Sequence, residues 1–557
     1  MFLRQKNSGS NVYLQIVEGV RENGKVRQRV IGTLGRLDDL QQSGKLDALL
    51  ASGAKFSDKV AIIGEYKKGG LTERGTKKIG PTMVFGRLWK ETGIEQCLQS
   101  LLQERRFQFD VQGAIFVTVL HRLLDPGSDR AANKWKDDYA FSESIGQLDL
   151  HQLYRTMAWL GEPLQSEEQK DRTPFAPRCV KDLVEENLFL MRRQLFTEVA
   201  LVFFDTTSIY FEGKGGQTLG RHGKSKDHRP DLKQMVVGLV LDGQGRPICC
   251  ELWPGNTADV KTLIPVIDRL SKKFRVTDIC IVADRGMISH ETVQTLEARN
   301  IGYILGARMR AQKEVRDQVV EDASGYQVVY PPRTCAKDPS PLEVKEVWVD
   351  NRRYVVCINE EQARKDARDR GNIVEALKKQ LARGDKSLVG NRGYRKFLKP
   401  LQNGFEIDPD KVDKESRYDG KWVLKTNTDM TTEKVALTYK MLWMVEQLFR
   451  TIKSLLETRP VFHKWDETIR GHVFCSFLAL VLMRELQDRM EAKGFGDAEW
   501  ADVLRDLDAL NQTEVQSQDG KRFRIRSESK GWCGKAFQAA AVSIPATITT
   551  IECDEVL

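Results

Sequence analysis

Short apolar runs, several of them rich in β-branched residues, dominate the chain between about residues 199 and 310. Runs of this length and composition predict buried strands, and the first of them, VALVFFDTTSIYF, occupies 199–211. Two further runs follow closely, and a segment with helical periodicity begins near Asp259. The strand DICIVADRG, a helix from about Ser289 and the strand GYILGARM complete the series. The predicted order is therefore three strands, a helix, a strand, a helix and a strand.

This order is that of a ribonuclease-H-like core, in which an antiparallel meander is followed by parallel strands with crossover helices. In such a core the first and fourth strands lie side by side. We therefore expect Asp205 in the first strand and Asp284 in the fourth to approach each other, although they are 79 positions apart (284 − 205).

Helical periodicity returns at about 431–456, where apolar residues at three- and four-residue spacing form one stripe. Another face of this predicted helix carries Tyr439, Glu446, Arg450 and Lys453. A surface ladder of ion pairs is one interpretation of this face. The other is that Glu446 completes an acidic site while Arg450 and Lys453 contact phosphates.

The distance from Asp284 to Glu446, 162 positions (446 − 284), indicates inserted material at about 310–430. Strand-like pieces and one very polar helical stretch within it predict a β-rich insertion with a basic helical arm. We expect a multidomain α/β protein: a ribonuclease-H-like catalytic core with a β-rich insertion domain and a helical N-terminal DNA-binding region. The expected segments are an N-terminal β-hairpin module at 1–70, a helical DNA-binding region at 75–180, the first part of the core at 195–310, the insertion at 311–430, the closing helices at 431–490 and a C-terminal module at 491–557.

The N-terminal part contains two recognisable patterns. Alternating residues at about 11–36 predict two strands joined by a turn at Glu22-Asn23-Gly24. Further on, DVQGAIFVTVLHRLL predicts an amphipathic helix that ends at Asp125-Pro126-Gly127, and Ser128 is suited to cap the next one. With Arg130, Lys134 and Lys136 this pair resembles a helix-turn-helix unit. An ordinary helical hairpin with a solvated basic face explains the pattern equally well.

Three acidic residues carry the chemistry that the pattern suggests. An acid inside a buried strand is costly unless it is paired or binds a cation. Asp205 and Asp284 at strand positions, with Glu446 on a helix, suggest a site for two hard divalent ions, as used in phosphoryl transfer. The alternative is that the two aspartates only cap strand ends.

Composition adds little to this picture. The net charge of +9 is mild for 557 residues, so charge alone is weak support for a polyanionic partner. Ten cysteines occur without a C-x-x-C pair, as expected of a reduced cytoplasmic protein. The longest apolar run is too short to span a bilayer, so we expect no membrane association.

With these residues in view, the chain resembles bacterial insertion-sequence transposases of the DDE superfamily, in the insertion-sequence-four-like group. That group carries Y-x2-R-x3-E-x6-K on the closing helix: Tyr439, Glu446 and Lys453 match, whereas Leu442 stands at the arginine position and Arg450 is a candidate replacement. The D-T-T and A-D-R-G contexts of the two aspartates and WPGNTAD at 253–259 also match. The resemblance covers about 199–490, and HRLLDPGSDRAANKW resembles the N-terminal region of one subgroup.

The resemblance implies metal-dependent cleavage of DNA at transposon ends and strand transfer into target DNA by attack of a 3′-hydroxyl on phosphodiesters. Asp205, Asp284 and Glu446 would bind two Mg²⁺ or Mn²⁺ ions. Tyr439, Arg450 and Lys453 would contact DNA. The implied partners are double-stranded DNA, as terminal inverted repeats and as target, and a second copy in a homodimeric synaptic complex, in the bacterial cytoplasm and associated with the nucleoid. Two alternatives stay open: a host-retained DNA-binding protein whose site has decayed, and a metal-dependent nuclease of the same fold.

Two further features are candidates for DNA contact. By its place on the last strand of the insertion, Trp422 resembles a tryptophan that stacks on a flipped base in relatives that make hairpin ends, although an aromatic residue in a strand usually belongs to the core. The loop at 220–234 is basic, and Arg229 and Lys233 are candidates for phosphate contacts; a solvated turn is the alternative. The histidines of this loop, His222 and His228, have no rigid ligand spacing.

Overall fold

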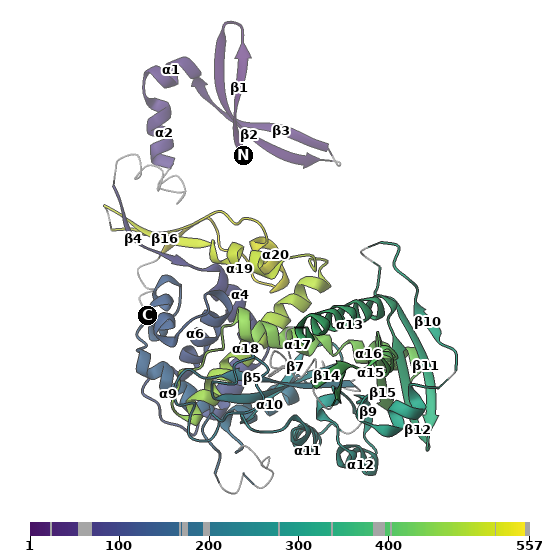
Figure 1. Ribbon diagram of the computed structural model, residues 1–557. Helices are drawn as coiled ribbons and strands as arrows, with labels where there is room; N and C mark the ends of the chain where they lie inside the picture. Colours follow the sequence, from purple (N-terminus) through teal and green to yellow (C-terminus); the bar gives the residue numbers. More distant parts are fainter. Residues whose placement is uncertain are drawn as a thin grey trace. The chain divides into compact units, whose positions relative to one another are not determined.

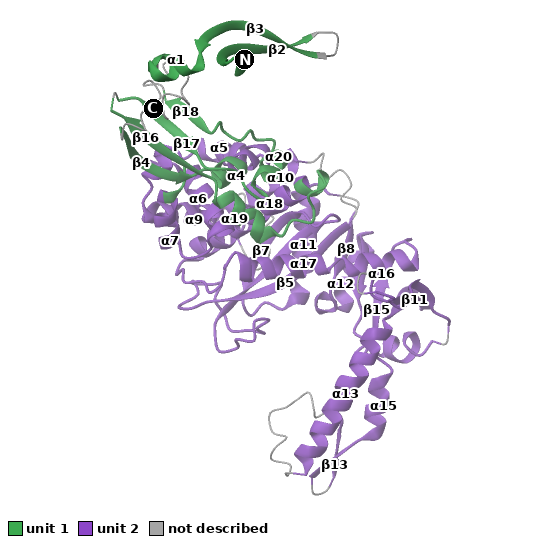
Figure 2. Cartoon of the chain, turned by 90° about the horizontal axis from the view of Figure 1, so that it is seen from above, with its two compact units in different colours: residues 1–84, 138–140, 490–557 green, residues 85–137, 141–489 purple. Residues whose placement is uncertain are grey.

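The computed structural model describes residues 1–22, 25–53, 70–165, 169, 177–192, 201–276, 279–322, 324–335, 338–382, 396–401, 404–518 and 520–551 (Figure 1). The chain forms two compact units (Figure 2). The first comprises Met1–Val84, Asp138–Ala140 and Met490–Leu557, and the second comprises Phe85–Asp137 and Phe141–Arg489.

The described residues of the first unit form two antiparallel sheets. One has the order β1-β2-β3 and is followed by two short helices; the elements are β1 (Phe2–Ser8), β2 (Asn11–Glu22), β3 (Lys25–Arg36), α1 (Leu37–Gln42) and α2 (Lys45–Gly53). The two strands predicted at about 11–36 are confirmed as β2 and β3, while Asn23 and Gly24 of the predicted turn lie outside the described residues.

The other sheet of this unit joins segments far apart in the sequence. Its order is β18-β17-β16-β4, from β4 (Leu71–Lys78), β16 (Asn511–Ser517), β17 (Arg522–Arg526) and β18 (Ile548–Ile551). Helices α19 (Trp500–Asp508) and α20 (Cys533–Ala539) belong to the same C-terminal segment. The side chain of Lys78 pairs with Asp508, so the C-terminal segment holds β4 through both backbone and side-chain contacts.

In the described part of the second unit, nine strands form one mixed sheet in the order β10-β11-β12-β15-β9-β8-β5-β6-β7. The segment at 201–306 supplies β5 (Leu201–Tyr210), β6 (Gln234–Asp242), β7 (Pro247–Pro254), α11 (Leu263–Lys272), β8 (Cys280–Ala283), α12 (His290–Ala298) and β9 (Gly302–Gly306). The predicted order of strands and helices is confirmed here. β5, β6 and β7 are antiparallel, and β8 and β9 run parallel to β5.

The strand pairing at the centre of this sheet positions two acids. Phe204 of β5 pairs with Ala283 of β8, so the next residue of each strand is an aspartate, Asp205 or Asp284. The expected neighbourhood of the first and fourth strands is therefore confirmed. Because side chains alternate across a sheet, Phe204 belongs to the core that α11 and α12 cover, and Asp205 points to the opposite face.

The inserted segment continues the same sheet. Its strands are β10 (Gln327–Tyr330), β11 (Leu342–Val349), β12 (Arg352–Ile358) and β15 (Lys421–Thr426), and β15 pairs with β9 through Leu424 and Gly306. Between β12 and β15 the chain forms an arm with a small core around Leu377 and Phe397. The arm consists of α13 (Glu360–Leu381), β13 (Leu398–Leu401), β14 (Gly404–Ile407) and α15 (Pro409–Ser416), and Figure 2 shows α13 and α15 side by side.

The prediction of one helix over about 431–456 is wrong. The chain forms three pieces: α16 (Thr432–Lys440), α17 (Trp443–Arg450) and a π-helical turn, η8 (Thr451–Leu455). Between the first two, the N–H groups of Leu442, Met444 and Val445 bond to carbonyls three residues back instead of four, which tightens the turn. Tyr439 and Glu446 therefore lie on separate helices and not on one continuous face.

Of the N-terminal helices of the second unit, α6 and α10 are mostly buried, and the others bury one side. They are α5 (Ile94–Leu102), α6 (Val111–Leu124), α7 (Asp129–Trp135), α8 (Glu143–Gly146), α9 (Leu150–Leu160) and α10 (Val180–Met191). Ser128 caps α7 as predicted, since its hydroxyl accepts from the N–H of Ala131. Of the three cations in the helix-turn-helix pattern, Arg130 and Lys134 are exposed, whereas Lys136 is buried and donates to the Gly146 carbonyl. None of the described helices is long and apolar enough to cross a bilayer.

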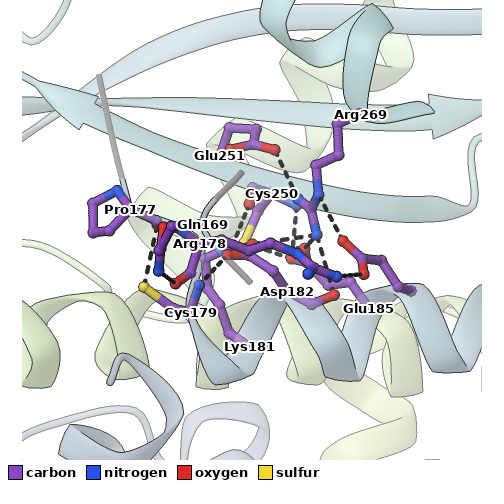
Figure 3. A network of polar contacts seen from close by, with 11 residues as sticks. Gln169, Pro177, Arg178, Cys179, Lys181, Asp182, Glu185, Cys250, Glu251 and Arg269 are labelled. Carbon is purple, nitrogen blue, oxygen red and sulfur yellow. Dashed lines mark hydrogen bonds and ion pairs between the residues drawn. The ribbon is translucent and has the colours of Figure 1, made fainter. Parts of the chain in front are cut away.

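A buried cluster of charges joins α10 to β7 and α11 (Figure 3). Arg269 donates to Glu185 and to Glu251, each at 2.7 Å, and Lys181 donates to Asp182 at 2.6 Å. The Arg269 guanidinium also lies within 3.4 Å of carboxylate oxygens of Asp182 and Glu186. One guanidinium therefore contacts four acidic side chains, and Lys181 and Arg178 supply further positive charge to the cluster.

Substitution of Arg269 by Met should lower the free energy of unfolding by about 3–5 kcal/mol, because it leaves buried carboxylates without a counter-charge. The matched control is Arg299→Met, which breaks an exposed pair with Asp268 and should cost less than about 1 kcal/mol. Urea denaturation of the full chain measures both changes. Equal losses in the two variants would show that Arg269 stabilises the fold no more than the exposed pair does.

Candidate active site

Asp205 lies within β5, and Asp284 directly follows β8, the neighbouring central strand of the sheet. Asp205 is half-buried, and its Oδ1 accepts from the N–H of Thr206 at 2.7 Å. Burial raises the pKa of Asp205 to about 6, against the lowering effects of Lys226 and of the Thr206 N–H. Asp284 directly precedes a 3₁₀ turn, η5 (Arg285–Met287). Two carboxylates thus lie next to each other in adjacent strands, one of them costly to ionise.

Tyr439 reaches this pair from α16. Its hydroxyl donates to Asp284 Oδ1 at 3.1 Å. A Cβ atom at Gly306 would lie 2.5 Å from the Tyr439 hydroxyl oxygen, so the phenol can pass only because the end of β9 is a glycine. Burial, together with the negative charges of Asp284 and Asp205, raises the pKa of Tyr439. The phenol therefore stays protonated and orients one carboxylate oxygen.

A fourth acid, Asp259, lies beside the pair. It begins a 3₁₀ turn, η4 (Asp259–Lys261), that follows β7. Its Oδ1 accepts from the Thr206 hydroxyl at 2.8 Å, and its Oδ2 lies 3.3 Å from Lys226 Nζ. A Cβ atom at Gly286 would lie within 4 Å of carboxylate oxygens of both Asp259 and Asp284. Our sequence reasoning missed Asp259 as a site residue, although WPGNTAD ends on it.

Glu446 lies on α17, which runs along β5. Near the start of α17, Met444 lies against Gly245 in the turn between β6 and β7. After the end of α17, Lys453 of η8 contacts Asp227 of the 220–234 loop. The Glu446 side chain is exposed. Within the described ranges, Asp205, Asp284 and Glu446 do not form a group whose ligand oxygens all lie within 4.8 Å of one another. The structure thus pairs two of the three acids by strand register and sets the third on the neighbouring helix.

The cations predicted to contact phosphate have different surroundings. Lys453 donates to Asp227 Oδ1 at 2.6 Å, and Arg459 pairs with the same carboxylate, which is 3% exposed. Burial lowers the pKa of Lys453. Arg450 is exposed and makes no ion pair with any residue that the structure describes. Leu442, at the position of the expected arginine, is buried.

The 220–234 loop is tied down on several sides. Arg229 forms a two-pronged contact with Asp231, at 3.0 and 2.9 Å, and lies over the ring of Tyr210. Lys233 donates to the Lys214 carbonyl at 3.3 Å. Lys226 pairs with Asp259 while a third of its side chain, 33%, stays exposed.

Trp422 is half-buried in β15, where it pairs with Cys357 of β12. Part of the indole is therefore accessible, and part packs within the sheet. Trp348, on β11, is 60% exposed.

A second cluster of possible metal ligands consists of Asp129, His463 and His472. Each offers one ligand atom, and these three atoms lie within 4.8 Å of one another; in the described ranges no other such group of three occurs. His463 Nε2 is 3.2 Å from Asp129 and 3.1 Å from His472 Nδ1. Arg122 donates to the same His472 nitrogen at 2.9 Å, and His472 Nε2 donates to the Thr458 carbonyl. Because a guanidinium already occupies the lone pair that a metal would need, we interpret this cluster as a hydrogen-bonded connection.

His121, next to Arg122, gives a testable pH dependence. Burial, with the charge of Arg122, lowers the pKa of His121 to about 4. The imidazole therefore stays neutral in the folded protein down to about pH 4, whereas in the unfolded chain it takes up a proton below about pH 6.5. The stability contributed by neutral His121 is complete above about pH 6.5 and is lost as the pH falls towards 4. The stability of wild type minus that of His121→Phe should therefore fall by about 1.4 kcal/mol per pH unit between about pH 6 and 4.5. Urea denaturation of both proteins across this range checks it, and a difference independent of pH would contradict it.

Comparison with known proteins adds the family. A family model described as "IS1634 family transposase, N-terminal domain" matches residues 3–65, and one described as "Transposase DDE domain" matches residues 200–482. No curated protein matches the chain. Among solved structures, a chain of the "Mos1 transposase paired-end complex with left transposon end" is similar at 17% identity over 38% of this chain and 57% of that chain, with a TM-score of 0.14. A likeness this weak does not bear on fold or function.

The DDE match includes Asp205, Asp284 and Glu446 and spans just over half of the chain. The expectation of an insertion-sequence transposase with a DDE domain is confirmed. The narrower expectation, the insertion-sequence-four-like group, is not confirmed, because the N-terminal match is to IS1634, a different family. The chain belongs to the family of transposases with a DDE domain.

Proposed function

We propose that this transposase cleaves DNA at the ends of its mobile element and joins those ends to target DNA by attack of a 3′-hydroxyl on a phosphodiester. The observation that carries the proposal is the register of β5 and β8, which gives Asp205 and Asp284 neighbouring positions. The strand order β7-β6-β5-β8-β9, with only the last three parallel, supports a ribonuclease-H-like core.

The donor set fits hard divalent cations. The candidate ligands Asp205, Asp284 and Glu446 offer only carboxylate oxygens, which Mg²⁺ and Mn²⁺ prefer. Asp205 and Asp284 hold neighbouring positions in adjacent strands, so their carboxylates can be shared by bound cations. Such ions, when bound, activate the attacking water or hydroxyl and stabilise charge on the transferring phosphoryl group.

The protein groups around these acids have separate roles in the proposal. Tyr439 fixes one oxygen of Asp284 by its hydrogen bond. Glu446, exposed on α17, is the third metal ligand. It has no ion pair with another described residue that it would have to break in order to bind a cation. In a two-ion site the three acids need not all bind the same ion, so the spread of their oxygens is compatible with it.

DNA binding is proposed for cations of α17, η8 and the 220–234 loop. Arg450, one turn after Glu446 on α17, takes the phosphate role that the buried Leu442 cannot supply. Arg229 and Lys233 contact the backbone from the loop, and Lys453 joins them where DNA phosphate displaces Asp227. The partners are double-stranded DNA and a second copy that holds the other end.

Tyr439, Glu446 and Lys453 support the insertion-sequence-four-like group, while the N-terminal match to IS1634 weighs against it.

Asp205→Asn, Asp284→Asn and Glu446→Gln should each reduce cleavage of terminal-repeat DNA by about a thousandfold or more, because bound ions supply several kcal/mol of transition-state stabilisation. Binding to the same DNA should change by less than about twofold. The control is Glu433→Gln, an exposed acid on α16, which should cleave normally. Gel assays of nicking, joining and binding give all three readouts.

Each other outcome has a distinct meaning. Normal cleavage by one variant would remove that residue from the site. Nicking without joining by the wild type would favour a nuclease, and binding without nicking would favour a decayed transposase.

We also propose that Trp422 stacks on an unpaired base in a reaction that passes through hairpin ends. The half-buried position of its indole in β15 supports this. Trp422→Ala should slow hairpin formation by about tenfold while first-strand nicking stays near normal, since one stacked base contributes about 1–3 kcal/mol. Trp348→Ala, which removes an exposed indole from β11, is the control. Equal slowing of nicking and hairpin formation would indicate that Trp422 only packs in the core.

A further inference from the structure

Asp259 is an acid of this site with no assigned role, and both of its oxygens are engaged. Oδ1 accepts from the Thr206 hydroxyl at 2.8 Å, and Oδ2 is paired with Lys226 at 3.3 Å. Its side chain is 25% exposed, so the pair is partly shielded from water. The partners come from β5 and from the 220–234 loop, and Asp259 itself follows β7. Three separate segments therefore meet at this carboxylate.

The ammonium group of Lys226 has all its donors in use. Nζ lies 2.7 Å from the Thr206 carbonyl, 2.8 Å from the Thr206 hydroxyl and 3.3 Å from Asp259. The backbone N–H of Lys226 donates to Ser208 at 2.8 Å, which fixes the start of the side chain. Lys226 makes no ion pair with Asp205 within 4.0 Å, although Thr206 is the next residue along β5.

This arrangement matters because Asp205 attracts the same cation. An ammonium group bound directly to Asp205 would occupy an oxygen that a divalent ion needs, and both cations compete for one negative charge. Asp259 offers Lys226 an alternative carboxylate, and Thr206 offers two further acceptors. Lys226 can then remain close to Asp205 without binding it.

We propose that Asp259 is a positioning residue that holds Lys226 away from Asp205 and so keeps the Asp205 carboxylate open to a divalent cation. The inference rests on the proposed function, in which Asp205 is a metal ligand. Asp259 acts through Lys226 and does not itself bind the ion. Without it, Lys226 turns to Asp205.

Mn²⁺ binding to the full-length purified protein tests this without any measurement of catalysis. Electron paramagnetic resonance of free Mn²⁺ gives the affinity. Asp259→Asn should weaken binding by about tenfold, in the range seen when groups that orient metal ligands are lost. Lys226→Met alone should bind at least as tightly as wild type. The double variant, Asp259→Asn with Lys226→Met, should return to within about threefold of wild type, because no ammonium is left to compete.

Two controls make the result specific. Asp268→Asn removes an exposed acid of α11 that pairs with Arg299 and should leave Mn²⁺ affinity unchanged. Thr206→Val removes the hydroxyl between Lys226 and Asp259 and should weaken Mn²⁺ binding by about threefold. Adding Lys226→Met to this variant should restore the affinity. This second variant keeps the test decisive if Asp259→Asn unfolds, which thermal melts would reveal.

The outcomes separate the inference from the proposed function. A double variant as weak as Asp259→Asn would overturn the positioning role, since the acid would then act on its own. Unchanged Mn²⁺ affinity in Asp259→Asn would overturn it as well. Failure of the proposed function appears elsewhere: Asp205→Asn would then bind Mn²⁺ as tightly as wild type.

Discussion

The register between β5 and β8 is the constraint on which the rest of the second unit depends. Four residue pairs, from Leu201 with Cys280 to Phe204 with Ala283, set it. The residues on one face belong to the core beneath α11 and α12, so a slip by one position would exchange the residues on the two faces and bring an acid into that core. The crossover through α11 is required because parallel neighbours cannot be joined by a short turn. The neighbouring positions of Asp205 and Asp284 follow from this register.

The predictable parts of the fold are those with local patterns. Strands buried on both faces are continuous apolar runs, so the elements between 201 and 306 were visible in the sequence. The break after Lys440 was not, because Met441 and Val445 keep a helical spacing across it while the hydrogen bonds shorten. Pairing between β4 and β16, or between β9 and β15, joins segments far apart in the chain. Such pairings leave no local signal, and the insertion could not be recognised from sequence as an extension of the same sheet.

The site shows the same division. Asp205 and Asp284 could be found because an acid at the end of an apolar run is unusual, and Glu446 because a family motif contains it. Partners could not be found: the bond from Tyr439 to Asp284 and the pairing of Lys453 with Asp227 join residues that only the fold brings together. The sequence predicts that Lys453 faces DNA phosphate, whereas in the structure it pairs with Asp227 of its own chain.

The arm between β12 and β15 begins and ends at one place. Ile358 and Lys421 are paired across adjacent antiparallel strands, and the N–H of Asn359 bonds to the Gly420 carbonyl at 2.9 Å. Topologically, everything between them is a single oversized hairpin loop. The entropy of closing such a loop grows only with the logarithm of its length, so residues can be gained or lost there at small cost to the ladder that closes it. The arm can therefore diverge in size during evolution, or accept a foreign domain, while the strands beside Gly306 keep their alignment.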